Sequence, residues 1–153
     1  MQFVRKILKN RKFTQLYDIF FTVIFLLIIL VMLCLIPVNY GLFFGYALGA
    51  LLMYVFFKLN WIISYFVLRN KKFKLYALFI LKTTLYFAIV ALIIYLMITI
   101  NCSHLEHLEP KINKPYTLLQ MVDRPINLFA FLGGLLTSFV AIILAQITIS
   151  LQK

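Results

Sequence analysis

Few side chains in the long apolar stretches of this chain could do chemistry, and the two that stand out are cations. Lys58 and Lys82 each lie within such a stretch, whereas the only acidic residue that any of these stretches contains is Asp18, at the edge of the first. A carrier coupled to protons or metal cations usually places a carboxylate in the membrane, because that group can exchange a proton or coordinate an ion. Drug–proton antiport is therefore disfavoured. No set of side chains resembles a catalytic site, so we expect neither an enzyme nor a bound cofactor.

Asn60 and Lys82 are predicted to meet at the same depth. Each lies about eleven residues from the turn near Asn70–Lys72, which corresponds to about 16 Å along a helix. An Asn carbonyl can accept a hydrogen bond from an ammonium group, which lowers the cost of placing Lys82 in the membrane. We group both residues with Lys58 as a polar latch. In the alternative interpretation, the two lysines reach the aqueous interface on their long side chains.

Glycines predict where helices approach each other closely. Gly41, Gly45 and Gly49 are four residues apart and fall on one face of a helix. Small residues at this spacing allow two helix backbones to come close together. Gly133 and Gly134 lie in the last apolar stretch, at a similar predicted depth. Either these two stretches pack on each other inside the molecule, which is the preferred interpretation, or the first face receives a helix of another subunit.

A further polar segment follows the third apolar stretch and contains Cys102, His104, Glu106 and His107. Zinc accepts such ligands, but its structural sites use more regular sets. A loop whose polar side chains are exposed to water explains the segment without a metal, and we expect no metal site. Cys34 lies within the first apolar stretch and behaves as a small apolar residue, so a disulfide with Cys102 is not expected.

Four apolar runs, each long enough to cross a membrane as a helix, must position these side chains. Hydrophobic residues make up 65% of the 153-residue chain and charged residues 12%, far from the mix of a soluble domain. About 20 apolar residues cross the hydrocarbon core as a helix, and no run alternates like a barrel strand. We predict an all-α, polytopic membrane protein with four transmembrane helices in one domain, residues 18–153. The predicted spans are 18–37, 41–68, 75–100 and 126–151, with an outer loop over 101–125.

The basic residues predict the orientation of the spans. Lys and Arg are concentrated before the first span and between the second and third, whereas the Val38–Tyr40 link carries no charge. By the positive-inside rule, both termini and the middle link face the cytoplasm. A composition rich in Phe, Ile, Leu, Lys and Tyr suggests an AT-rich bacterial genome, and therefore a bacterial plasma membrane.

The first 17 residues are predicted to form a separate basic cytoplasmic segment. They interleave basic and apolar residues, so they form either an amphipathic helix on the membrane surface or a basic tail that only sets the topology. The net charge of +11 is attributed to topology and to attraction for anionic lipid head groups. Membrane lipids are thus predicted partners. Nucleic acid is not, because the basic residues flank membrane spans and no nucleic-acid-binding module is recognisable.

A wider pattern extends over spans two to four. In chain order it consists of Gly41, Gly45, Gly49, Asn60, a basic turn, Lys82, Asn127–Leu128 and Gly133–Gly134. Over residues 40–151 this arrangement resembles the ATP synthase protein I family, the I subunit of bacterial F-type ATP synthase operons. The resemblance implies a non-catalytic protein that helps c subunits assemble into the rotor ring. A role in magnesium or calcium entry has also been suggested for that family.

Assembly is the interpretation that the residues accommodate better. Rotor c subunits are glycine-rich helical hairpins, and the face of Gly41, Gly45 and Gly49 offers a surface for close packing. Entry of divalent cations requires several oxygen ligands, usually including carboxylates, which the spans lack. The competing class is transport, for example a flippase that holds the phosphate of a lipid-linked substrate with Lys58 and Lys82. Co-purification separates these classes, because an assembly factor brings rotor subunits and a flippase brings lipid.

Overall fold

The described part of the chain forms five helices, four of them long and apolar enough to cross a membrane. The computed structural model describes residues 2–69, 75–108 and 117–152, and the side-chain surroundings of 12–64, 80–106 and 117–152. The helices are α1 (Gln2–Cys34), α2 (Tyr40–Arg69), α3 (Leu75–Leu108), α4 (Leu118–Asp123) and α5 (Leu128–Leu151). No strand occurs in these described parts. Within the residues whose side chains are described, the segments long and apolar enough to cross a membrane are Lys12–Cys34, Tyr40–Ser64, Ile80–Glu106 and Leu128–Leu151. The predicted all-α class with four membrane helices is confirmed.

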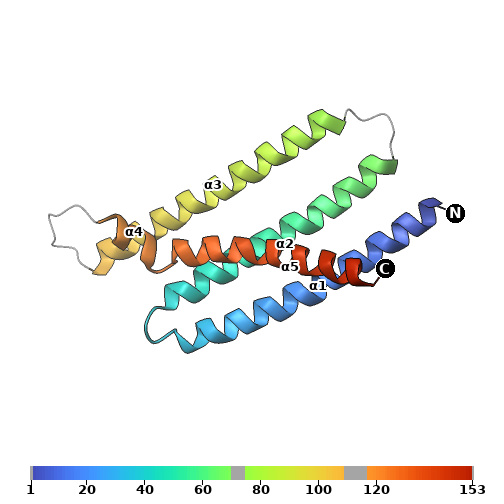
Figure 1. The fold of residues 1–153 in the computed structure, drawn as a ribbon. Coiled ribbons are helices and arrows are strands. Elements are labelled where there is room, and N and C mark those ends of the chain that lie inside the picture. Colours follow the sequence, from blue (N-terminus) through green and yellow to red (C-terminus); the bar gives the residue numbers. More distant parts are fainter. Residues whose placement is uncertain (1, 70–74, 109–116, 153) are drawn as a thin grey trace.

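The two ends of the bundle differ in what they carry. Both termini lie at one end, together with the end of α2 and the start of α3, and we call this the terminus end (Figure 1). The turn between α1 and α2 lies at the opposite end, as do α4 and the start of α5, and we call this the cap end. The helix backbones of α1, α2 and α5 approach one another closely, whereas α3 approaches mainly α4. The bundle is therefore a three-helix core with α3 standing to one side.

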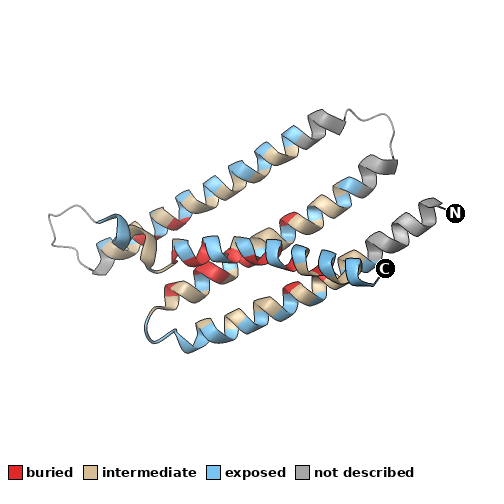
Figure 2. Ribbon diagram, in the orientation of Figure 1, coloured by how far each residue is buried: buried red, intermediate tan, exposed pale blue. Residues whose placement is uncertain are grey.

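The core is built from aromatic and small side chains of α1, α2 and α5. Its largest members are Tyr17 and Phe21 on α1 and Tyr46 on α2, and Ala141 and Ala145 line the facing side of α5. Figure 2 shows the buried positions concentrated where α2 and α5 cross. Large apolar side chains otherwise point outward, as expected for helices surrounded by lipid, because lipid tails are as apolar as these side chains.

α3 contributes less to the buried core than the other long helices do. Only 11% of its apolar window is buried, against 39% for α5 and 28% for α2. The window of α1 is buried to the same 11%, but Tyr17 and Phe21 of α1 belong to the core. Within Ile80–Glu106 only Met97 and Asn101 are buried, both near the cap end.

The predicted N-terminal segment is continuous with the first long helix. We predicted a separate segment over residues 1–17, and α1 runs from Gln2 to Cys34 without a break. Tyr17 is fully buried and stacks on Phe57, with 3.6 Å between ring centroids. The stacking of aromatic rings draws this part of α1 into the bundle. The helix therefore passes from the predicted segment into the predicted first span without an interruption.

The predicted outer loop also contains more helix than expected. The structure extends α3 to Leu108 and forms α4 at Leu118–Asp123. Thr117 caps α4: its hydroxyl accepts a hydrogen bond from the Gln120 backbone, and the Gln120 side chain reaches back to the Thr117 backbone. This capping box satisfies amide groups that an isolated short helix leaves unpaired. As a result, the cap end is held as a folded unit.

Candidate functional site: the attachments of α3 and the packing of α2

The glycine face of α2 is filled by α5. A Cβ atom on Gly45 would collide with the carbonyl oxygen of Asn127, and one on Gly49 with that of Phe131. Gly134 of α5 faces the α2 backbone in the same way, so that a Cβ there would strike the Tyr46 carbonyl oxygen. The two helices pack at backbone contact, which only glycine permits. This face is therefore used inside the molecule and is not open to another subunit.

Gly41 and Gly133 have different surroundings. Gly41 lies at the cap end of the same face, where an added Cβ would come within 2.6 Å of the Asp123 carbonyl oxygen. Gly133, by contrast, has no atom within 4 Å of the position of an added Cβ. The prediction that Gly133 contacts a helix is wrong, because successive residues of a helix point about 100° apart and only Gly134 faces α2.

Buried hydroxyl pairs reinforce this packing. The Tyr46 hydroxyl lies 2.8 Å from that of Thr137, and the Tyr17 hydroxyl lies 2.6 Å from that of Ser138. Both pairs are buried and join α5 to its two neighbours. Such bonds between membrane helices contribute about 0.6 kcal/mol each on average. The hydroxyl pairs were not predicted from the sequence, although Thr137 follows Gly134 by three residues and so lies on nearly the same helix face.

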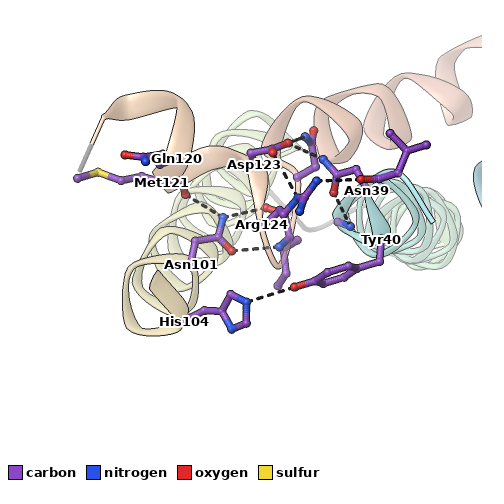
Figure 3. Close-up of polar contacts among 12 residues, drawn as sticks. Asn39, Tyr40, Asn101, His104, Gln120, Met121, Asp123 and Arg124 are labelled. Carbon is purple, nitrogen blue, oxygen red and sulfur yellow. Dashed lines mark hydrogen bonds and ion pairs between the residues drawn. The ribbon is translucent and has the colours of Figure 1, made fainter. Parts of the chain in front are cut away.

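A polar network closes the cap end around Asp123 (Figure 3). One carboxylate oxygen of Asp123 accepts hydrogen bonds from the side-chain amides of Asn39, at 2.6 Å, and Asn127, at 2.8 Å. Asn127 also caps α5, because its side-chain oxygen accepts from the Ala130 backbone at 2.8 Å. The Arg124 guanidinium donates to the Val38 carbonyl oxygen at 2.8 Å. The network thereby ties the first hairpin to the start of α5.

Asn101 attaches the cap end of α3 to this network. Its side chain is 1% exposed and donates to the carbonyl oxygens of Met121, at 2.8 Å, and Ile126, at 2.9 Å. Its oxygen accepts from the Ile126 backbone at 3.0 Å. One turn further along α3, His104 lies 3.2 Å from the Tyr40 hydroxyl. Figure 3 shows both side chains directed from α3 toward the other elements of the cap.

The polar segment proposed as an alternative metal site is thus partly engaged in this cap. His104 contacts Tyr40, and the described side chains include no group of three or more metal-ligating residues. The side chain of His107 and residue Glu109 lie outside the described residues.

Toward the terminus end, the contacts with α2 that the described part of α3 makes come from its side chains. The Lys82 ammonium donates a hydrogen bond to the side-chain oxygen of Asn60, so the structure joins the two residues that were predicted to share a depth. One turn nearer the cap, the rings of Tyr86 and Phe56 stack with 4.2 Å between centroids and 6° between planes. The Tyr86 hydroxyl also lies 3.4 Å from the Phe56 carbonyl oxygen.

Lys58 belongs to a different contact. It forms an ion pair with both carboxylate oxygens of Asp18 on α1, at 2.6 and 2.7 Å. The Tyr54 hydroxyl donates to the same carboxylate at 3.3 Å, and the ammonium lies 5.3 Å from the Tyr54 ring centroid. The assignment of Lys58 to the latch is therefore wrong. Its position two residues from Asn60 turns it toward the other side of α2.

Comparison with known proteins assigns neither a family nor a function to this chain. No protein-family model, curated protein or solved structure matches this chain. The function is therefore inferred from the arrangement of the protein's own residues.

Between its two attachments, α3 presents an exposed stripe that we call the α3 seam. The seam consists of Leu81, Leu85, Ala88, Leu92, Tyr95 and Thr99, all of which are exposed. Its members alternate in steps of four and three residues, the spacing at which two helices pack along their length. The seam could not be chosen from the sequence, because an apolar run offers many such stripes and only the structure shows that this one is exposed at every position.

Proposed function

We propose that this protein is a non-catalytic assembly factor of the bacterial plasma membrane, which helps the c subunits of the F-type ATP synthase to form the rotor ring. The observation that carries the proposal is the exposed α3 seam, which extends across the membrane on a helix that the core leaves uncovered. Its four large members, Leu81, Leu85, Leu92 and Tyr95, suit the small-residue face of a glycine-rich hairpin, because large side chains fill the space over small ones.

The docking surface therefore differs from the one expected from the sequence. The face of Gly41, Gly45 and Gly49 cannot receive a c subunit, since α5 occupies it at backbone contact. The seam offers a surface of comparable length without disturbing the core. The glycine face in turn gives the core the rigidity that a holding surface requires.

Charge supports an orientation with the terminus end in the cytoplasm. Lys and Arg are concentrated in the first turns of α1, at this end of the bundle, and in the sequence between α2 and α3, as the positive-inside rule requires of a cytoplasmic face. The same residues attract anionic lipid head groups. The seam then runs from the cytoplasmic half of the membrane to the outer half, beside a partner hairpin inserted in the same bilayer.

Transport by a lysine pair is the less favoured function. A flippase that holds a phosphate between Lys58 and Lys82 needs both ammonium groups to face one site. Lys58 is paired with Asp18 on the α1 side of α2, whereas Lys82 contacts Asn60 on the α3 side. The two cations do not form one site.

The proposal is tested by purifying the tagged protein in mild detergent and identifying co-purified proteins by mass spectrometry. We expect enrichment of c subunits with the natural sequence. Enrichment should fall about tenfold, equivalent to about 1.4 kcal/mol, when Leu85 and Leu92 are both changed to alanine. The matched control changes Leu26 and Leu33 of α1, which are also seven residues apart and similarly exposed, and should keep the c subunits. Recovery of lipid alone from the natural protein would contradict the proposal.

A further inference from the structure

The two ends of α3 are attached in different ways. At the cap end, Asn101 is buried and bonds to backbone groups of residues 121 and 126. Backbone groups within a folded cap have little freedom, and breaking these bonds would leave buried polar groups unpaired. Met97, 2% exposed, packs in the same region. This end of α3 is held in one position.

The contacts at the terminus end are of another kind. Lys82 reaches Asn60 with a long, flexible side chain, and both residues are half-buried. The stacked rings of Tyr86 and Phe56 form a second contact. The backbones of α2 and α3 do not pack closely here, as the separation of the two ribbons in Figure 1 also shows. Side-chain contacts of this kind can break and re-form without unfolding either helix.

Few buried side chains oppose a displacement of the part of α3 between these ends. No residue of α3 from Ile80 to Leu96 is buried, although Phe56 of α2, which stacks on Tyr86, is buried. Displacing a helix that is buried along its length opens a cavity, but a helix that faces lipid along most of its length leaves none there. Among the described residues, displacing α3 therefore breaks mainly the contacts that Lys82 and Tyr86 make with α2.

We propose that α3 is a pivoting arm, with its pivot at Asn101 in the cap and its latch at the Lys82–Asn60 hydrogen bond. From Lys82 to Asn101 the helix measures about 28 Å at 1.5 Å per residue. A change in tilt of about 20°, within the range of membrane helices, moves the latch end by about 10 Å. Such a hinged displacement is one of the common forms of conformational change.

Opening of the latch uncovers the side of α2 that carries Phe56 and Asn60, and so widens the entry for a helical partner. That consequence rests on the proposed function. The motion itself does not, since it follows from the attachments of α3 in the isolated protein. A measurement without any partner can therefore test it, and its failure would leave the pulldown result untouched.

The test is a distance measurement by double electron–electron resonance on the full chain in lipid nanodiscs. Cys34 and Cys102 are first replaced by alanine, and spin labels are placed on pairs of exposed residues. The latch pair is Leu59 with Leu81, and the pivot pair is Phe44 with Ile100. Lys82→Met removes the latch bond. Lys58→Met is the matched control, because it removes a membrane lysine that does not contact α3.

We expect two distances for the latch pair and one for the pivot pair in the natural background. Lys82→Met should at least double the share of the longer latch distance, whereas Lys58→Met and the pivot pair should be unchanged. A single narrow latch distance in both the natural background and Lys82→Met would overturn the proposal. Equal broadening of the latch and pivot pairs would also overturn it, because α3 would then move without a pivot.

Discussion

Lys58 and Asn60 lie two positions apart on α2 and tie it to different neighbours. Lys58 pairs with Asp18 of α1, and Asn60 accepts a hydrogen bond from Lys82 of α3. Two positions correspond to about 200° around a helix, so one polar contact is made on each side. Because α2 also carries the glycine face that meets α5, it is the helix to which all the other membrane helices are attached.

The packing of α2 on α5 predicts a strong effect of any side chain at Gly49. Gly49→Val would place a branched side chain against the Phe131 carbonyl oxygen, and we expect a loss of about 3 kcal/mol, at the upper end of the usual cost of overpacking. Thermal unfolding in detergent, followed by intrinsic fluorescence, measures it. Gly133→Val is the matched control and should change stability by less than about 0.5 kcal/mol, since space is open there. Equal melting temperatures for the two variants would contradict the observed packing.

The Asp18–Lys58 ion pair predicts a measurable coupling between α1 and α2. The side chains are 38% and 30% exposed, so each single change, Asp18→Asn or Lys58→Met, should cost only about 1 kcal/mol. The double variant should be less destabilised than the sum of the two, because it leaves no unpaired charge. Unfolding of the four proteins in the mutant cycle measures this coupling. Strict additivity would mean that the two groups do not interact.

The pivot at Asn101 predicts a specific loss of order in the cap. Asn101→Leu removes three hydrogen bonds to the backbone of residues 121 and 126 and should cost about 3 kcal/mol, because buried backbone groups lose their partners. Thr99→Val serves as the control. The Thr99 hydroxyl is exposed and bonds only the Tyr95 carbonyl oxygen of its own helix, so its loss should be nearly neutral. Hydrogen exchange of residues 118–127 should rise in Asn101→Leu alone, and unchanged protection would argue against the pivot.

The fold could be predicted from the sequence because membrane spans are a local property of the chain. Apolar run length and basic residues require no knowledge of tertiary structure. Counting residues from a turn was enough to pair Asn60 with Lys82. The same count applied to the first hairpin would have paired Asp18 with Lys58, since each lies about twenty residues from Val38–Asn39, at equal depth along a helix.

Other features required the three-dimensional arrangement. Asn101 stands at the predicted edge of a span, and its position alone indicates only a polar boundary. Its partners are backbone groups of residues 121 and 126, and their placement depends on the folding of α4. The choice between Gly133 and Gly134 was similarly open, because it depends on the rotation of α5 about its axis. Packing sets this rotation, and the sequence of an almost wholly apolar helix gives little indication of which face packs on a neighbour.

Cysteine cross-linking provides a direct check on which side of α2 meets α3. In a background without Cys34 and Cys102, cysteines at positions 60 and 82 should be joined by a short bifunctional thiol reagent, because the native side chains span the distance between these positions with a hydrogen bond. The matched pair of positions 58 and 82 should not, since Lys58 is directed toward α1. Mobility on non-reducing gels of a variant with a protease site between α2 and α3 reports the cross-link. Efficient cross-linking of both pairs would mean that α3 is not latched to one face, and cross-linking of neither would place it elsewhere.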